Sequence, residues 1–158
     1  MQASIRGAIA AALAVAATEL FRLQFPIYAL IAAIIVTDPS PARTRQLGLP
    51  RLAGTFLGAT VGATLSLATG RIPDLGPLVI GFGILSAMFL SHLLGMKDAA
   101  KVAGYVSGVV LLTHSEQPWS YALYRVIETS LGVSAAVLVS FVPKLLRNDK
   151  SSQPDSSR

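Results

Sequence analysis

An arginine and a glutamate lie deep in an apolar stretch near the end of the sequence. Arg125 and Glu128 are three residues apart, so on a helix they share one face and can neutralise each other. An ionisable side chain inside an apolar segment is a candidate for ligand binding or proton transfer, because burying a charge is costly. The alternative is that Arg125 extends to a nearby aqueous surface with Glu128 as its partner. Glu128 lies deeper in the segment and fits that alternative less well.

The residue patterns of known catalytic and metal sites are missing from the sequence. The chain has no cysteine, which excludes a disulfide scaffold and a cysteine-ligated metal site. His92 and His114 have no partner at i,i+4 spacing, and we interpret both as packed or interfacial side chains. There is no phosphate-binding loop and no HExxH or GxSxG motif. We therefore expect no enzyme activity, no catalytic residue, no metal and no cofactor.

A row of glycines forms a second pattern with a physical meaning. Gly54, Gly58 and Gly62 recur at four-residue spacing, which places them on one face of a helix. Glycine on such a face lets a neighbouring helix approach closely, and close contact holds helices together in lipid. Gly132 takes a matching place in a later segment. We interpret these glycines as helix-packing positions within one bundle, or alternatively at a subunit interface or along the wall of a transport pathway.

The composition predicts the class of protein that carries these residues. The chain has 158 residues and a net charge of +5, and it is 53% hydrophobic and only 13% charged. An ordinary soluble domain has about 25% charged residues, which it needs to cover its surface. The basic residues are scattered and form no dense patch, which argues against a nucleic-acid partner. We expect an all-α integral membrane protein surrounded by a lipid bilayer.

Six transmembrane helices account best for the apolar segments, with four or five as the alternative. A span needs about 20 mainly apolar residues. Two charge-free windows reach about that length, and the others qualify where a charge near one end extends to the membrane surface, as Arg6, Arg22, Lys101 and Arg125 can. The predicted spans are 4–21, 25–38, 51–69, 76–95, 99–114 and 121–142.

The basic residues predict the orientation of these spans. With six spans, ten of the 13 Lys and Arg residues fall on one side of the membrane, so both termini are predicted to be cytoplasmic. Residues 1–143 form the predicted membrane domain, and the polar residues 144–158 form a predicted disordered tail. The small residues at 14–17 also fit a signal-peptide cleavage site, an alternative that the charge asymmetry disfavours.

The third and sixth predicted spans share a spacing of arginine, threonine and small residues. Because these two spans run in opposite directions in the six-span arrangement, the shared spacing is typical of an inverted repeat of two three-helix halves. Chance is the alternative, since small residues are common in membrane helices. If the repeat holds, the two arginines mark opposite mouths of one bundle. The matched positions are Arg51, Thr55, Gly58 and Gly62 with Arg125, Thr129, Gly132 and Ala136.

The order of residues from 38 to 62 resembles a known family signature. Asp38-Pro39, Thr44 and Gly48, followed by RLAGTFLGATVG at 51–62, look like the signature of the fusaric acid resistance and aromatic acid exporter superfamily. The segment RVIETSLG at 125–132 is similar to part of the last bundle helix of those proteins. The plant aluminium-activated malate transporters belong to the same broad group. The resemblance covers most of 1–143.

The sequence also departs from this family. Pro26-Ile27-Tyr28-Ala29 stands where members commonly have a tryptophan. Many members carry a second bundle or a cytoplasmic domain, and these 158 residues contain neither, from which we expect a homo-oligomer.

The resemblance implies a six-helix bundle in the bacterial inner membrane that exports organic, often aromatic, anions. On this interpretation Arg51 and Arg125 bind the anion, and Glu128 sets its position or couples its movement to a proton. The alternative comes from another functional class, a non-transporting membrane subunit or scaffold that packs against a partner.

Overall fold

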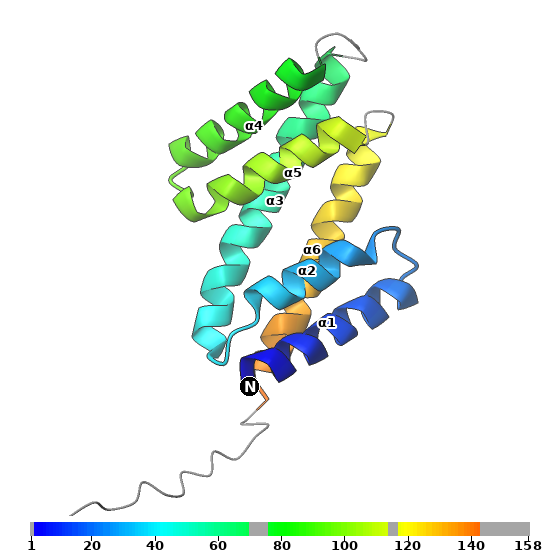
Figure 1. Cartoon of the computed structure of the whole chain (residues 1–158), viewed down its shortest axis with the longest axis vertical. Helices are drawn as coiled ribbons and strands as arrows, with labels where there is room; N and C mark the ends of the chain where they lie inside the picture. Colours follow the sequence, from blue (N-terminus) through cyan, green and yellow to red (C-terminus); the bar gives the residue numbers. More distant parts are fainter. Residues whose placement is uncertain (1, 70–75, 114–116, 143–158) are drawn as a thin grey trace, which may run out of the picture.

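The computed structural model describes residues 2–69, 76–113 and 117–142, and the secondary structure of these residues is entirely helical. This confirms the predicted all-α class. The predicted tail, 144–158, and His114 lie outside the described residues. Figure 1 shows the helices in chain order: α1 (Gln2–Leu20), α2 (Pro26–Val36), α3 (Pro41–Thr69), α4 (Gly76–Leu93), the short 3₁₀-helix η2 (Lys97–Ala99), α5 (Ala100–Thr113) and α6 (Pro118–Ser140).

Four of these helices are long and apolar enough to cross a membrane, namely α1, α3, α4 and α6. The helix α2 is strongly apolar but has 11 residues, and α5 has 14. At about 1.5 Å per residue, both are shorter than the hydrocarbon core of a bilayer. Every predicted span overlaps a helix, whereas the number of spans and the side of the termini stay predictions.

The start of the third helix was predicted wrongly. We expected the span to begin at Arg51, but α3 begins at Pro41 and continues through Pro50. Its start is fixed by Thr44, whose Oγ1 accepts a hydrogen bond from the Asp38 N–H at 3.1 Å and donates one to the Asp38 carbonyl at 3.2 Å. Proline removes one N–H from a helix and does not always end it. Arg51 therefore lies within a helix, not in a loop at the mouth of the bundle. Its side chain is nearly buried, at 9% exposed.

The packing supports the inverted repeat. The helix α3 packs against α4 and α5, whereas α6 packs against α1 and α2, and α3 and α6 pack against each other. Figure 1 shows α3 and α6 running in opposite directions along the molecule. Arg51 and Arg125 are 74 residues apart, and the same shift relates two close helix contacts. A Cβ on Gly58 would meet the Ala103 backbone. Its counterpart on Gly132 would meet the backbone of Ala29, 74 residues before Ala103.

The interior is built from small residues and the exterior from large apolar ones. One buried cluster joins α1, α2 and α6 and consists of alanine and valine, and a second joins α3, α5 and α6. Large apolar side chains point outward, including Leu78 at 70% exposed, Leu112 at 69% and Leu138 at 67%. Outward leucines and an alanine-rich interior are expected of helices packed in lipid, where close approach replaces the hydrophobic effect.

Arg6 does not extend to the membrane surface as predicted. It is 4% exposed, and its guanidinium donates hydrogen bonds of 2.8 Å to the carbonyls of Pro39 and Val142. A buried arginine needs such acceptors, and here the free carbonyls of the 2–3 connection and of the end of α6 provide them. Arg6 thus joins three segments that are distant in sequence. The alternative of cleavage near 14–17 stays a prediction.

Candidate anion site in the helical bundle

Arg125 on α6 is buried at 4% exposed and points toward α2, not outward as one alternative had it. Its guanidinium carbon lies 3.3 Å from the centre of the Tyr28 ring, a close cation–π contact. Among the described residues, neither its Nε nor its Nη1 has a hydrogen-bond partner. Burying an arginine whose N–H groups have no acceptor costs free energy of folding. Such a group is expected where a bound ligand supplies the acceptors.

Three aromatic rings lie beside this arginine, and we call Phe25, Tyr28 and Tyr121 the aromatic cluster. The Phe25 and Tyr121 rings meet edge to face at 5.2 Å, and Tyr28 lies 6.0 and 6.1 Å from them. The Tyr121 hydroxyl donates a 2.7 Å hydrogen bond to the Tyr28 hydroxyl. Tyr121 is buried at 2% exposed and faces α2.

Glu128 is fully buried and anchors the start of α2. Its Oε1 accepts a 2.7 Å hydrogen bond from the N–H of Phe25, the N-cap residue of that helix, whose own side chain makes no cap bond. A carboxylate at a helix N-terminus satisfies a free N–H and interacts favourably with the helix dipole. In the described part of the chain no hydrogen bond or ion pair joins Glu128 to Arg125, and Glu128 Oε2 has no hydrogen-bond partner.

Arg125 and Glu128 thus lie close enough on α6 for their charges to interact, as expected, without a direct bond between them in the described structure. Three-residue spacing places both side chains on one face of α6, but each is used by a different part of α2, the ring of Tyr28 and the N–H of Phe25. The spacing along α6 does not predict which groups of the facing helix α2 lie within reach. Here these groups, the Tyr28 ring and the Phe25 N–H, determine what each side chain contacts.

A second arginine lies near the first, beside an aromatic ring that both approach and that belongs to α5. The guanidinium carbon of Arg51 is 5.6 Å from the centre of the Tyr105 ring, and that of Arg125 is 5.7 Å from the same centre. Arg51 is also nearly buried, and its Nε has no hydrogen-bond partner among the described residues. The structure thus brings Arg51 and Arg125 to one ring, instead of placing them at opposite mouths. Sequence reasoning missed Tyr105, an isolated aromatic residue in an apolar run.

The predicted packing glycines lie at helix crossings within the chain. Cβ atoms on Gly54 and Gly62 would come within 2.6 Å of the Ala99 carbonyl oxygen and 2.9 Å of the Ser107 carbonyl oxygen, both far inside van der Waals contact. Together with Gly58, they form the face of α3 on which α5 rests. Gly132 has the same relation to α2. Of the two alternatives, the contacts in this structure are those of packing within one bundle.

Two cavities lie on either side of the arginines. One, of about 390 Å³, is lined by residues from the end of α2, from α3 and from the start of α5, including Arg51. The other, of about 180 Å³, is lined by the connection before α2 and the first turns of α6, including Phe25 and Tyr121 of the aromatic cluster. Figure 1 shows the first set of segments toward the left of the view and the second toward the right.

The histidine and acidic side chains form no other polar centre in the described residues. No three of them lie close enough to hold a metal ion. The Nδ1 atom of His92 lies 2.8 Å from the Met88 carbonyl one turn earlier on the same exposed helix face, which fits an interfacial side chain.

Comparison with known proteins places most of the chain in one family. Residues 11–139 match the family described as fusaric acid resistance protein-like. The p-hydroxybenzoic acid efflux pump subunit AaeB of Escherichia fergusonii is 27% identical over 152 residues, which is 86% of this chain and 23% of that protein. The protein of the same name from Erwinia billingiae is 27% identical over 154 residues, with 86% and 24% covered. The chain thus spans about a quarter of the length of these relatives. No solved structure matches. The similarity to plant malate transporters stays a prediction.

Proposed function

Since the chain belongs to the fusaric acid resistance protein-like family, we propose that it is a membrane transporter that exports organic anions, aromatic carboxylates among them, and is not an enzyme. The relatives named above are efflux pump subunits for p-hydroxybenzoic acid, which has a carboxylate and an aromatic ring. The observation that carries the proposal is Arg125, a buried cation with idle donors beside the aromatic cluster.

The chemistry of this site suits such an anion. A guanidinium binds carboxylates through charge-assisted hydrogen bonds, which are stronger than bonds between neutral groups. Because Nε and Nη1 of Arg125 have no partner in the described structure, an entering carboxylate would displace no existing bond. The edges and faces of Phe25, Tyr28 and Tyr121 offer the contacts that an aromatic ring prefers. Arg51, which approaches the same Tyr105 ring, adds a second positive charge.

Glu128 has a positioning role in this proposal. Its bond to the Phe25 N–H holds the start of α2, and α2 carries Tyr28 against Arg125. The carboxylate thus sets the geometry of the aromatic cluster without touching the anion. A proton taken up on Oε2, which has no partner in the described structure, is the route by which Glu128 could couple anion movement to protons.

We further propose that all six helices cross the bacterial inner membrane, with both termini in the cytoplasm, and that the chain works as a homo-oligomer. The basic residues of the starts of α1, α3 and α5 support this orientation, because cytoplasmic ends of spans carry most of the Lys and Arg. The helices α2 and α5 are short, but each lies beside a longer helix, α2 beside α1 and α5 beside α4 (Figure 1).

The test is flux of p-hydroxybenzoate through vesicles that contain the purified full chain. Arg125→Gln removes the charge at the site, and Arg43→Gln is the matched control because Arg43 is exposed on the first turn of α3. We expect Arg125→Gln to lower flux at least about tenfold, the loss of one charge-assisted bond, and the control to keep it. Equal flux in both variants would remove Arg125 from the mechanism.

A second candidate is a non-transporting subunit that packs against a partner. It is favoured by the relatives named above, which are subunits of efflux pumps. Folded wild-type chain that carries no p-hydroxybenzoate flux alone, but restores flux when a partner is added, would favour this candidate.

A further inference from the structure

The cavity of about 390 Å³ has a charge pattern that the proposed transport at Arg125 does not explain. We call it the basic vestibule. Three of its lining side chains are basic and one is acidic, and the others are apolar or neutral. They are Ile35, Gln46, Leu47, Pro50, Arg51, Lys97, Asp98, Lys101 and Val102.

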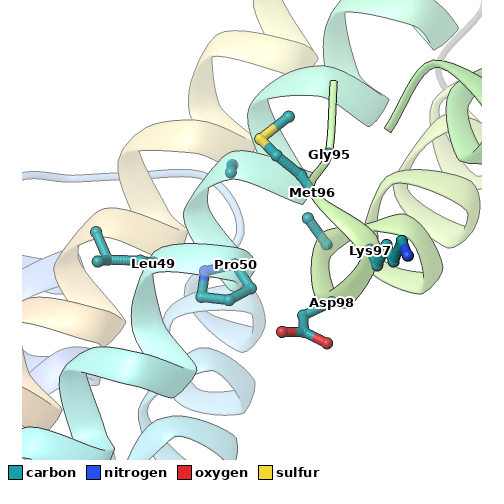
Figure 2. Close-up of a pocket in the computed structure, with 8 residues that line it drawn as sticks. Leu49, Pro50, Gly95, Met96, Lys97 and Asp98 are labelled. Atoms are coloured by element: carbon teal, nitrogen blue, oxygen red, sulfur yellow. The ribbon is translucent and has the colours of Figure 1, made fainter. Parts of the chain in front are cut away.

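The basic side chains of the vestibule are free to attract a ligand. The side chains of Lys97 and Lys101 are exposed, and no hydrogen bond or ion pair joins either side chain to another described residue, Asp98 included. Arg51 lies deeper, nearly buried, with its Nε idle among the described residues. The vestibule therefore has two exposed cations at its rim and a third further in. Figure 2 shows a neighbouring cavity of about 240 Å³, in which Pro50 of α3 faces the segment that carries Lys97 and Asp98.

Among the described residues, no basic side chain lines the cavity on the other side. The side chains that line it are neutral, namely Gln24, Phe25, Gln117, Ser120, Tyr121 and Tyr124. An anion is attracted to the basic vestibule by Coulomb forces and to this neutral cavity only by hydrogen bonds. The basic vestibule therefore attracts anions more strongly than the neutral cavity at the other side of the candidate pathway.

The vestibule leads toward the buried site through a shared ring. Arg51 lines the vestibule, and its guanidinium carbon is 5.6 Å from the Tyr105 ring centre. Arg125 is 5.7 Å from the same centre. A carboxylate that leaves Arg51 therefore has its next guanidinium beside the same aromatic ring, without crossing a long apolar gap.

We propose that the basic vestibule is a loading site for organic carboxylates, separate from the Arg125 site, in which Lys97 and Lys101 collect the anion and Arg51 passes it inward. This inference rests on the proposed function. A loading site leaves the transport equilibrium unchanged, and it lowers the anion concentration that half-saturates the vestibule side. The neutral cavity has no such effect on its own side.

The first experiment measures initial rates of p-hydroxybenzoate flux from each side of sealed, oriented vesicles. In the variant with both Lys97→Gln and Lys101→Gln, we expect KM from the vestibule side to rise roughly fivefold, the Coulomb effect of two exposed charges. Maximal rate, and KM from the other side, stay unchanged. Arg43→Gln, which removes one charge outside the vestibule, leaves KM unchanged. Raising the salt concentration shrinks the difference between wild type and the double variant. An unchanged KM, or an equal rise on both sides, would overturn the proposal.

The second experiment separates failure of this inference from failure of the transport function. Equilibrium binding of p-hydroxybenzoate is measured on the Arg125→Gln chain in nanodiscs of zwitterionic lipid, where no flux is required. We expect weak binding that Lys97→Gln with Lys101→Gln abolishes. Loss of binding with Arg125→Gln alone would overturn the separate site. Binding that is blocked by adding phosphatidylglycerol would also overturn it, by assigning the vestibule to a lipid headgroup.

Discussion

Replacing Arg125 by methionine separates a binding role from a structural one. Methionine has a similar length, is apolar and adapts to irregular spaces, so it fills the site without a charge. If Arg125 held the bundle together, its removal would weaken the fold. The structure shows instead a buried guanidinium with one strong contact, the Tyr28 ring at 3.3 Å, and two idle donors in the described part of the chain.

The expected magnitude follows from these contacts. A desolvated cation–π contact contributes about 2 kcal/mol. Each buried donor without an acceptor costs about 1–3 kcal/mol. The two idle donors of Arg125 therefore offset the contact with Tyr28, and Arg125→Met is expected to change the free energy of unfolding by no more than about 1 kcal/mol toward instability. Removing one member of a buried ion pair would instead cost about 3–5 kcal/mol.

The assay is thermal and denaturant unfolding of both chains in the same nanodiscs, with p-hydroxybenzoate flux measured in parallel. We expect Arg125→Met to unfold at nearly the wild-type midpoint and to carry almost no flux. A destabilisation of 3 kcal/mol or more, the lower end of the roughly 3–5 kcal/mol expected for a broken buried ion pair, would refute the reasoning, because the arginine would then be a structural residue. Unchanged stability with unchanged flux would refute the binding role.

The remaining predictions concern packing and anchoring. Gly58→Ala forces a Cβ into the α5 backbone, so we expect the free energy of unfolding to fall by about 1–3 kcal/mol. The control Gly81→Ala, where a Cβ would meet nothing within 4 Å, is expected to be neutral. Equal effects of the two changes would contradict the packing role. Glu128→Leu removes the acceptor of the Phe25 N–H and lowers the free energy of unfolding by about 1–3 kcal/mol. Glu128→Gln retains an acceptor and most of the stability. Indistinguishable melting curves of the two variants would contradict the role of Glu128 in anchoring α2. Arg6→Ala loses two charge-assisted bonds and is expected to expose the end of α6 to protease within minutes; wild-type digestion would contradict it.

Much of the helix pattern was predictable because it depends on local chemistry. Proline favours the first turn of a helix, where its missing N–H has no cost, and Pro26 and Pro118 stand at the first turns of α2 and α6. The start of α3 was missed because Arg43, Arg45 and Pro50 indicate a loop when taken one by one. The bonds between Asp38 and Thr44, which begin that helix earlier, depend on a turn geometry that spacing alone does not give.

The candidate site was predictable in its residues and not in its contacts. Burial of charge singled out Arg125 and Glu128 in the sequence, and the shared spacing and the family resemblance singled out Arg51; all three are buried. The groups that these three side chains contact belong to α2 and α5. Which groups these are depends on how α2 and α5 cross α3 and α6, and this crossing cannot be deduced from local sequence. Tyr105 carries no signal in the sequence, since an aromatic residue in an apolar run is ordinary. The proposed repeat with its 74-residue shift was a long-range relation that the sequence indicated, and the close approaches at Gly58 and Gly132 support it.

The most direct test of the account is a distance between the anion and Arg125. Solid-state NMR on the full chain in lipid can measure it between p-hydroxybenzoate labelled with ¹³C at its carboxylate and the ¹⁵N-labelled guanidinium of arginine. We predict a separation of about 4 Å, as in a hydrogen-bonded carboxylate–guanidinium pair, and its disappearance in Arg125→Met. Bound p-hydroxybenzoate with no arginine nitrogen nearby, or a contact that survives in Arg125→Met, would contradict the central claim.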